Sequence, residues 1–218
     1  MKTVYFVRHG ETLFNQQRRL QGWRDSPLSD RGVEQVRRVA RALKRLEIHE
    51  ALISPLGRAR QTAAIICEEL GICSFETPDL REVSFGDFEG NTLEELDIRF
   101  PGMWAARTAD KWNFRPPGGE ANRDAVPRAR AVVKKIEEMP SDRILLVVAH
   151  FAINRIVLSR LAGIEPEETI IMNIPHEVIY RAQGGNSNWE ISHLDVRENH
   201  QDFQPGWLTE KLKLPTGG

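Results

Sequence analysis

The sequence has little cysteine, no long apolar run and almost no net charge. Only Cys67 and Cys73 occur among the 218 residues, and the helical pattern around Cys67 favours two buried thiols over a disulfide or metal site. No run approaches the ~20 apolar residues that a transmembrane helix needs. Arg8 and His9 follow Met1 so closely that the apolar core of a signal peptide does not fit. We therefore expect a cytoplasmic protein with no membrane partner.

The charges of the chain nearly cancel. There are 30 Lys and Arg against 31 Asp and Glu, which gives no electrostatic case for a nucleic-acid partner. Apolar residues make up 40% of the chain, enough for a packed core. The length favours a single domain, which we place at residues 1–196, with a lid-like insertion around 100–119 and a C-terminal tail over 197–218. Three residues of that tail are candidates for docking on the core: Phe203, Trp207 and Leu208.

Apolar patterns along the chain alternate between strand-like and helix-like. Strands are predicted over residues 2–7, 51–53, 143–149, 178–180 and 189–194. Helical spacing predicts helices over residues 29–46, 58–70, 93–100, 125–139 and 153–161. Ser29 is the expected N-cap of the first helix, and Gly71 the expected stop of the second. The alternation is typical of an α/β fold, a three-layer α/β/α sandwich with a mostly parallel central sheet.

Polar residues stand where two predicted strands end. His9 follows the first strand, and His150 follows the strand at 143–149. Ligands of open α/β sheets bind beyond the carboxyl ends of parallel strands, so these histidines could be neighbours. Arg8 precedes His9, and Arg58 opens a helix, whose N-terminal amides also suit an anion. Guanidinium groups bind phosphate oxygens in a bidentate manner, so the pattern indicates a dianion site without a metal.

An acid is also available between the second and third predicted helices. Glu82 ends a short apolar segment, and Asp87 and Glu89 follow it. Like charge disfavours ionisation of a carboxyl beside a bound phosphate. Such a carboxyl can stay protonated and donate to a leaving alkoxide. The pattern alone does not separate Glu82, Asp87 and Glu89 in this role.

Several short segments together resemble the signatures of the histidine phosphatase superfamily, also called the phosphoglycerate mutase-like family. In chain order they are RHGET at 8–12 followed by Asn15, LQGW at 20–23, DSPLSDRG at 25–32, SPLGRARQT at 54–62, LRE at 80–82 with EG at 89–90, PGGE at 117–120, and AH at 149–150. The first segment alone is only moderately specific. The ordered set, which spans about residues 1 to 160, is a strong resemblance and implies the phosphoglycerate mutase-like fold.

The resemblance implies a metal-independent phosphatase of the histidine acid phosphatase type, with no cofactor. His9 would be the nucleophile, and Glu82 the general acid and then the base for the attacking water. Arg8, Arg58 and His150 would hold the phosphoryl oxygens. The expected substrate-binding residues are Asn15 in the phosphate pocket, Gln21 and Gly22 at its edge, and Thr12 and Phe151. Imidazole attacks only through an unprotonated nitrogen, so we expect the other ring nitrogen of His9 to donate to a backbone carbonyl, with that of Gly10 as the candidate.

Three positions depart from the family pattern. Phe151 stands where a glycine usually follows the second histidine, and it could narrow the pocket. Ala121 replaces a common Ser or Thr, which leaves Asn122 as a candidate helix cap. His176 either faces the site or is an ordinary loop histidine.

Hydrolysis of a small phosphorylated metabolite is the leading interpretation. A cofactor-dependent phosphoglycerate mutase stays open because of the tail, although such mutases resemble a longer chain. A non-catalytic phosphate-binding module is disfavoured, since His9, Arg58 and Glu82 are all present. Dimers are common in the family, so a homodimer is open. Arg107, Lys111 and Arg115 could meet a second anion or form a solvated face, and Trp104, Trp112 and Phe114 could stack on a sugar or simply pack.

Overall fold

A seven-stranded sheet forms the centre of the computed structural model, which describes residues 1–165, 167–185, 188–198 and 202–209. The strands are β1 (Lys2–Arg8), β2 (Glu50–Ile53), β3 (Cys73–Glu76), β4 (Ile144–Ala149), β5 (Val178–Gly185), β6 (Asn188–Asp195) and β7 (Gln204–Pro205). Their order is β3-β2-β4-β1-β5-β6-β7. The first four strands in the chain run parallel to one another, and β5 to β7 add to the β1 edge in antiparallel pairs. The sheet is therefore mostly parallel, as predicted.

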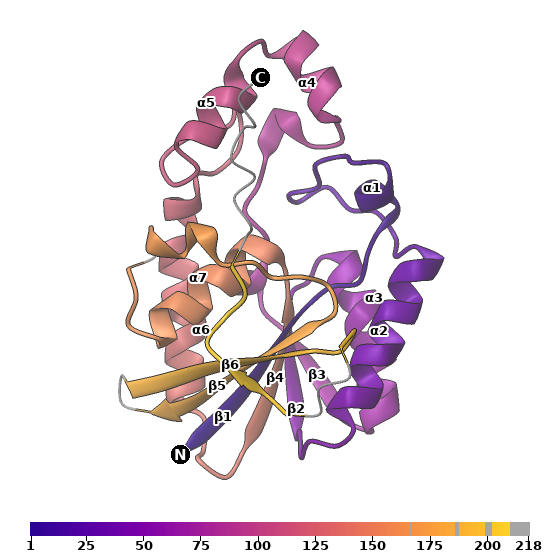
Figure 1. Cartoon of the computed structure of the whole chain (residues 1–218), viewed down its shortest axis with the longest axis vertical. Helices are drawn as coiled ribbons and strands as arrows, with labels where there is room; N and C mark the ends of the chain where they lie inside the picture. The colour runs from indigo at the N-terminus through magenta and orange to yellow at the C-terminus, as the bar shows by residue number, and fades with distance from the viewer. Residues whose placement is uncertain (166, 186–187, 199–201, 210–218) are drawn as a thin grey trace.

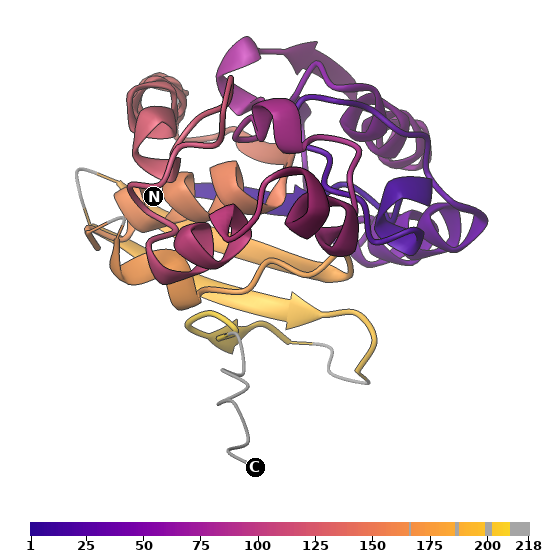
Figure 2. The ribbon, with the colours of Figure 1, turned by 90° about the horizontal axis from the view of Figure 1, so that it is seen from above.

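Helices cover both faces of this sheet. They are α1 (Leu13–Gln16), α2 (Asp30–Leu43), α3 (Gly57–Leu70), α4 (Leu93–Arg99), α5 (Met103–Ala109), α6 (Val126–Glu138) and α7 (Phe151–Leu161). Figure 2 shows α6 and α7 on one side of the sheet and α2 and α3 on the other. Two buried apolar clusters correspond to these sides. Alternate residues of a strand belong to different clusters: Val4 and Phe6 of β1 lie in one, and Tyr5 and Val7 lie in the other. The predicted α/β/α sandwich is confirmed.

Local sequence explains where two of the long helices begin and end. The Ser29 side chain accepts from the Gly32 amide at the start of α2, and Val36, Val39 and Leu43 form its buried stripe. Gly71 ends α3 with a φ of 68°, a left-handed conformation that glycine adopts without strain. None of the helices in the described part of the chain has the length and apolarity needed to cross a membrane.

The sequence did not predict β3, the edge strand. All four of its residues are exposed, so no alternating buried pattern marks it. Cys73 lies in this strand and is exposed, whereas Cys67 on α3 is half-buried. The prediction of two buried thiols is therefore wrong for Cys73, because the edge position leaves it open to solvent.

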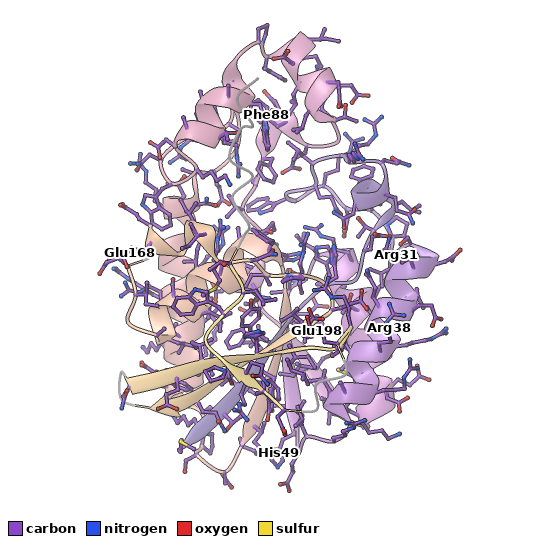
Figure 3. All side chains as sticks on the ribbon, in the orientation of Figure 1. Arg31, Arg38, His49, Phe88, Glu168 and Glu198 are labelled. Atoms are coloured by element: carbon purple, nitrogen blue, oxygen red, sulfur yellow. The ribbon has the colours of Figure 1, made fainter. Side chains whose placement is uncertain are left out.

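The predicted lid-like segment around residues 100–119 contains α5 and directly follows α4, and both helices lie beyond the carboxyl ends of the central strands (Figure 1). The aromatic ring of Phe88, which Figure 3 labels beneath this segment, is fully buried. Its ring centroid lies 5.2 Å from that of Phe100 and 6.4 Å from that of Phe114. Trp112 packs against the core shared by α6 and α7. Of the two alternatives for Trp112 and Phe114, the structure therefore shows packing.

The described part of the tail adds to the sheet. β7 pairs with β6, and the Phe203 ring centroid lies 5.8 Å from that of Tyr5. The Leu208 amide donates to the Tyr180 hydroxyl over 3.2 Å, and Trp207 packs against the core. All three residues singled out as docking candidates thus contact the folded body, whereas residues 210–218 lie outside the described part.

Candidate active site

A pocket of about 230 Å³ opens beyond the carboxyl ends of β1 and β4. Its position follows from the parallel register, in which Arg8 pairs with Ala149 and so brings His9 beside His150. The residues that line it are Arg8, His9, Asn15, Arg19, Leu20, Gln21, Gly22, Arg58, Glu82, Val83, Phe85, Arg107, Lys111, Asn122, Phe151, Ala152 and Arg155. Six of them are Arg or Lys and one is a carboxylate, so the pocket is suited to an anion.

His9 is buried at the base of this pocket, and both of its ring nitrogens have neighbours. Its Nδ1 lies 2.8 Å from the Gly10 carbonyl oxygen, and the Arg58 Nε–H points to its Nε2 over 3.3 Å. A carbonyl only accepts and a guanidinium only donates, so the proton belongs on Nδ1 and the lone pair on Nε2. Burial, followed by the charge of Arg58, holds the pKa of His9 well below its usual value. The imidazole is therefore neutral, with an unprotonated Nε2 that faces Arg58.

Gly10 has a steric reason to be glycine. A Cβ at this position would lie 2.7 Å from the Gly32 carbonyl oxygen and 2.7 Å from Cγ2 of Val36 on α2. The turn after β1 passes so close to α2 that a side chain has no room. This contact keeps the carbonyl of Gly10 where the His9 ring can use it.

Arg58 sits in the first turn of α3 and is almost fully buried. Its guanidinium donates to the Gly22 carbonyl over 2.7 Å and to Asp25 Oδ1 over 3.1 Å. Burial lowers its pKa, and Asp25 opposes that effect. The Asp25 carboxylate also accepts from the amides of Gly57 and Arg58, which caps a helix whose own N-cap residue, Leu56, offers no side-chain acceptor.

Arg8 ends β1 and is only partly satisfied by the protein. Its guanidinium donates to the Ile174 carbonyl over 3.2 Å, while its buried Nε has no partner among the described residues. Burial lowers its pKa to about 10, and the charge of Glu82 works in the opposite direction. A buried donor without a partner is costly, so this atom favours an anion in the pocket.

His150 occupies the N-cap position of α7, with its ring centroid 5.2 Å from that of His9. Its Nε2 lies 2.7 Å from the Ser54 hydroxyl, and its buried Nδ1 has no partner among the described residues. Burial and then the charge of Arg58 keep its pKa well below the usual value. His150 does not itself line the pocket, but it lies directly behind His9 as a neutral ring.

The three candidate acids occupy different places. Glu82 lines the pocket, and its Oε1 accepts from the amides of Val83, Ala152 and Ile153 over 2.9 to 3.2 Å. Among the residues that the structure describes, its Oε2 accepts from the Ala152 amide alone, over 3.1 Å. Asp87 is exposed and does not line the pocket. The geometry therefore selects Glu82 as the carboxyl that can reach a ligand.

Glu89 joins two loops at the pocket edge. Its Oε1 accepts from the Trp23 amide, the Ser84 hydroxyl and the Phe85 amide over 2.9 to 3.0 Å. Its Oε2 accepts from the Arg24 amide over 2.8 Å. All four neighbours are donors, so an ionised carboxylate is the group that satisfies them together.

The expected substrate-binding residues fall into two groups. Asn15, Gln21, Gly22 and Phe151 line the pocket. Thr12 does not: its fully buried side chain accepts from the Asn15 amide and caps α1. The Asn15 Oδ1 in turn accepts from the Thr12 amide. Thr12 thus holds Asn15 in place and does not line the cavity, which corrects the expectation that it contacts the substrate.

Asn122 also differs from its expected role. The carboxylate of Asp124 accepts from the Ala121 amide over 2.6 Å and so caps the short 3₁₀ turn η3 (Asn122–Ala125). Asn122 instead donates to the Lys111 carbonyl over 2.7 Å and lines the pocket. A helix cap at Asn122 was therefore the wrong prediction, because Ala121 occupies the N-cap position and the Asp124 side chain bonds to its amide.

The sequence left His176 open between the site and an ordinary loop, and it did not predict the roles of Asp25 and Ser54. His176 faces the site, with its Nδ1 2.6 Å from the His9 carbonyl oxygen and its ring centroid 5.5 Å from that of His9. Burial and the charge of Arg8 lower its pKa to about 3. Asp25 and Ser54 lie inside segments that resemble the family, which was the available signal. Their contacts join parts of the chain 33 and 96 residues apart, and spacing does not reveal such contacts.

Comparisons with known proteins agree on one family. A family model described as "Histidine phosphatase superfamily (branch 1)" matches residues 4–197. A "Probable phosphoglycerate mutase GpmB" of Erwinia tasmaniensis is 30% identical over 206 residues, covering 89% of this chain and 96% of that protein. A protein of the same name from Yersinia pestis is 34% identical over 192 residues, with 88% and 89% covered.

Solved structures show the same architecture. A mycobacterial glucosyl-3-phosphoglycerate phosphatase in complex with VO3 superposes with a TM-score of 0.80 at 26% identity, covering 89% of this chain and 99% of that one. The alpha-ribazole phosphatase of Shigella flexneri superposes with a TM-score of 0.82 at 23% identity, covering 88% and 96%. At that lower identity the likeness shows the fold alone.

Proposed function

The chain belongs to the histidine phosphatase superfamily, and on the geometry of its pocket we propose that it hydrolyses a small phosphomonoester through a phosphohistidine on His9. The observation that carries the proposal is the fixed tautomer of this residue. Nδ1–H is directed to the Gly10 carbonyl, and Nε2 bears the lone pair at the pocket base. A neutral, oriented imidazole is a nucleophile that needs no further activation.

In the first displacement, His9 Nε2 attacks phosphorus and the P–O bond to the alcohol breaks. The guanidinium groups of Arg8 and Arg58 stabilise the negative charge on the phosphoryl oxygens. For His150, which lies beside His9, we assign the tautomer in which Nε2 accepts from the Ser54 hydroxyl and Nδ1 carries the proton. Its role in holding the phosphoryl group, which the resemblance implies, stays a prediction. Phosphoryl transfer depends mainly on positioning and charge stabilisation, and two buried Arg in contact with the pocket support that role.

Glu82 serves as the acid in this step and as the base in the next. Within the described part of the chain its Oε2 accepts one amide hydrogen bond, against three for Oε1, so we place the transferable proton on Oε2. The proton passes to the leaving alcohol oxygen. The resulting carboxylate then takes a proton from water, whose oxygen attacks phosphorus as the N–P bond breaks. Inorganic phosphate leaves, and His9 and Glu82 return to their starting states.

Turnover of p-nitrophenyl phosphate in the presence of EDTA tests this function. We expect chelator-resistant hydrolysis by the wild type, loss of at least about 10³-fold in His9→Ala, and an acid-labile phosphoenzyme trapped only in the wild type. His49→Ala is a matched control, because this histidine lies outside the pocket. Hydrolysis that persists in His9→Ala, or labelled phosphoenzyme on that variant, would overturn the assignment.

A phosphoglycerate mutase is the second candidate, supported by the printed name of the curated relatives. Mutase and phosphatase share the phosphohistidine and differ in whether the phosphoryl group passes to substrate or to water. Interconversion of 3- and 2-phosphoglycerate without release of phosphate would favour the mutase. Release of one phosphate for each ester consumed would favour the phosphatase. A cytoplasmic location and a homodimer stay predictions from the sequence.

A further inference from the structure

The cations of the pocket fall into two groups with different surroundings. Arg58 is paired with Asp25, and Arg19 forms a two-pronged pair with Glu95 over 2.6 and 3.0 Å. Arg8 and Arg58 are near His9, where the phosphoryl group is proposed to bind. Arg107, Lys111 and Arg155 also line this pocket. The phosphoryl group does not account for this second set.

Arg107 is the best-defined member of the second set. It lies on α5, and its guanidinium carbon is 4.7 Å from the centroid of the Phe85 ring and 5.0 Å from that of the Trp104 ring. Among the residues that the structure describes, no carboxylate lies within ion-pair distance of it. Aromatic faces orient a guanidinium while leaving its N–H edges available. Burial and the charge of Arg155 lower its pKa to about 10, as expected for a cation held without a counter-ion.

The ring of Phe151 contacts one arginine of each cationic group. The guanidinium carbon of Arg8 lies 5.2 Å from the centroid of its ring, and that of Arg155 lies 5.0 Å from it. Arg155 also donates to the Ile170 carbonyl over 2.8 Å, which helps to fix its position. One aromatic ring therefore contacts two cations of the same pocket. A glycine at position 151 would provide neither the spacing nor the stacking surface.

Glu82, the proposed acid, lines the same pocket as the second group. The negative charge of Glu82 opposes the effect of burial on the pKa of both Arg107 and Arg8. Asn122 lines the same pocket, and its buried Oδ1 has no partner among the described residues. A buried acceptor of this kind is suited to a hydroxyl of the bound molecule.

From this arrangement we propose that Arg107 and Arg155 form a second anion subsite, which binds a carboxylate or a second phosphate carried by the alcohol part of the substrate. The proposal rests on the phosphoester hydrolase function and narrows its substrate class to doubly anionic phosphomonoesters. Arg107 determines specificity by contact with the substrate and takes no part in bond breaking.

The matched pair 3-phosphoglycerate and glycerol 3-phosphate tests the subsite, because the two esters differ by a carboxylate in place of a hydroxymethyl group. Their binding is measured by calorimetry on the His9→Ala protein, which keeps the rest of the pocket. We expect 3-phosphoglycerate to bind at least about tenfold more tightly, the scale of one charge-assisted hydrogen bond. Adding Arg107→Gln should reduce that ratio to within about twofold. Arg107→Lys, which keeps the charge and loses the planar fork, should give an intermediate ratio.

Arg115→Gln is the matched control from the same segment. Arg115 is paired with Asp124 over 2.7 Å and does not line the pocket, so this variant should keep the wild-type ratio. Equal affinity for the two esters in the parent protein would overturn the subsite for carboxylates. An equal loss for both esters in Arg107→Gln and Arg107→Lys would show a general effect on the pocket and would also overturn it.

A second pair decides which anion the subsite takes. Fructose 1,6-bisphosphate and fructose 6-phosphate differ by a phosphate. The ratio of their binding affinities is measured on the same proteins. A preference in this pair alone assigns a second phosphate, and one in the glycerate pair alone assigns a carboxylate. No preference in either pair rejects the subsite. Binding does not depend on turnover, so p-nitrophenyl phosphate hydrolysis by the wild type separates failure of the subsite from failure of the proposed function.

Discussion

The Asp25 carboxylate holds Arg58 from two directions. It accepts from the guanidinium over 3.1 Å and from the backbone amide of the same residue over 3.2 Å. It also accepts from the Gly57 amide, so one side chain caps α3 and orients the arginine that faces His9. Asp25 is exposed and lies outside the pocket lining, which makes it a positioning residue.

Replacing Asp25 should therefore reduce activity without removing any group from the pocket. We expect Asp25→Ala to lower kcat/KM for p-nitrophenyl phosphate by about 10- to 100-fold, as charged hydrogen bonds are lost. Asp25→Asn keeps an acceptor for the amides and should recover part of that loss. Asp30→Asn, at an exposed residue in the first turn of α2, is the control. Equal activity of Asp25→Ala and wild type would contradict the positioning role.

Glu82→Gln should affect substrates according to their leaving groups. General acids contribute about 10² to 10⁴ to rate, and a poor leaving group depends on that proton most. We expect a loss of at least about 100-fold on an alkyl phosphate such as glycerol 3-phosphate and less than about tenfold on p-nitrophenyl phosphate. The measurement is kcat/KM for both esters, with Asp87→Asn as control because Asp87 is exposed. Equal losses on the two esters would exclude Glu82 as the acid.

Phe151→Ala should weaken the positioning of the two arginines that contact this ring. The stacking of Arg8 and Arg155 on this residue is lost, and each such contact is worth about 0.5 to 2 kcal/mol. We expect KM for p-nitrophenyl phosphate to rise by about 2- to 30-fold, with a smaller change in kcat. Phe75→Ala, on the exposed edge strand β3, should leave both constants unchanged. A fall in kcat alone would show that Phe151 acts on the chemical step instead.

Stability should fall as the pH drops below about 6.5, the usual pKa of histidine. Burial lowers the pKa values of His9, His150 and His176 in the folded state, the last to about 3. Between these lowered pKa values and about 6.5, the unfolded chain therefore binds more protons than the folded chain. The free energy of unfolding rises with pH across this window and falls on acidification.

His176→Asn isolates one of these contributions. Below the pKa of histidine in the unfolded chain, this substitution should reduce the slope of the free energy of unfolding against pH. The reduction should reach up to about 1.4 kcal/mol per pH unit, the value for one proton. Urea unfolding at pH 5 and pH 7 measures the difference between variant and wild type. The same slope in both proteins would show that His176 is not the buried neutral group that its contacts indicate.

Much of the fold was predictable because its signals are local. The buried strand before His9, the apolar centre of β4 and the stripe of α2 all follow from side-chain periodicity. The edge strand β3 escaped prediction because all of its residues are exposed. The helix α5 inside the lid segment escaped too, since it has no buried residues that would mark a helical stripe.

The sequence by itself determined the strand-to-loop motif around His9, the stop at Gly71 and the family signatures, because neighbouring residues specify them. Only the tertiary structure decided which acid reaches the pocket, which carboxylate orients Arg58 and which histidine supports the His9 backbone. These choices depend on contacts between residues far apart in the chain, such as Asp25 with Arg58 and His176 with His9. The spacing of residues in the sequence does not predict these contacts, because they form only when the strands and helices pack together.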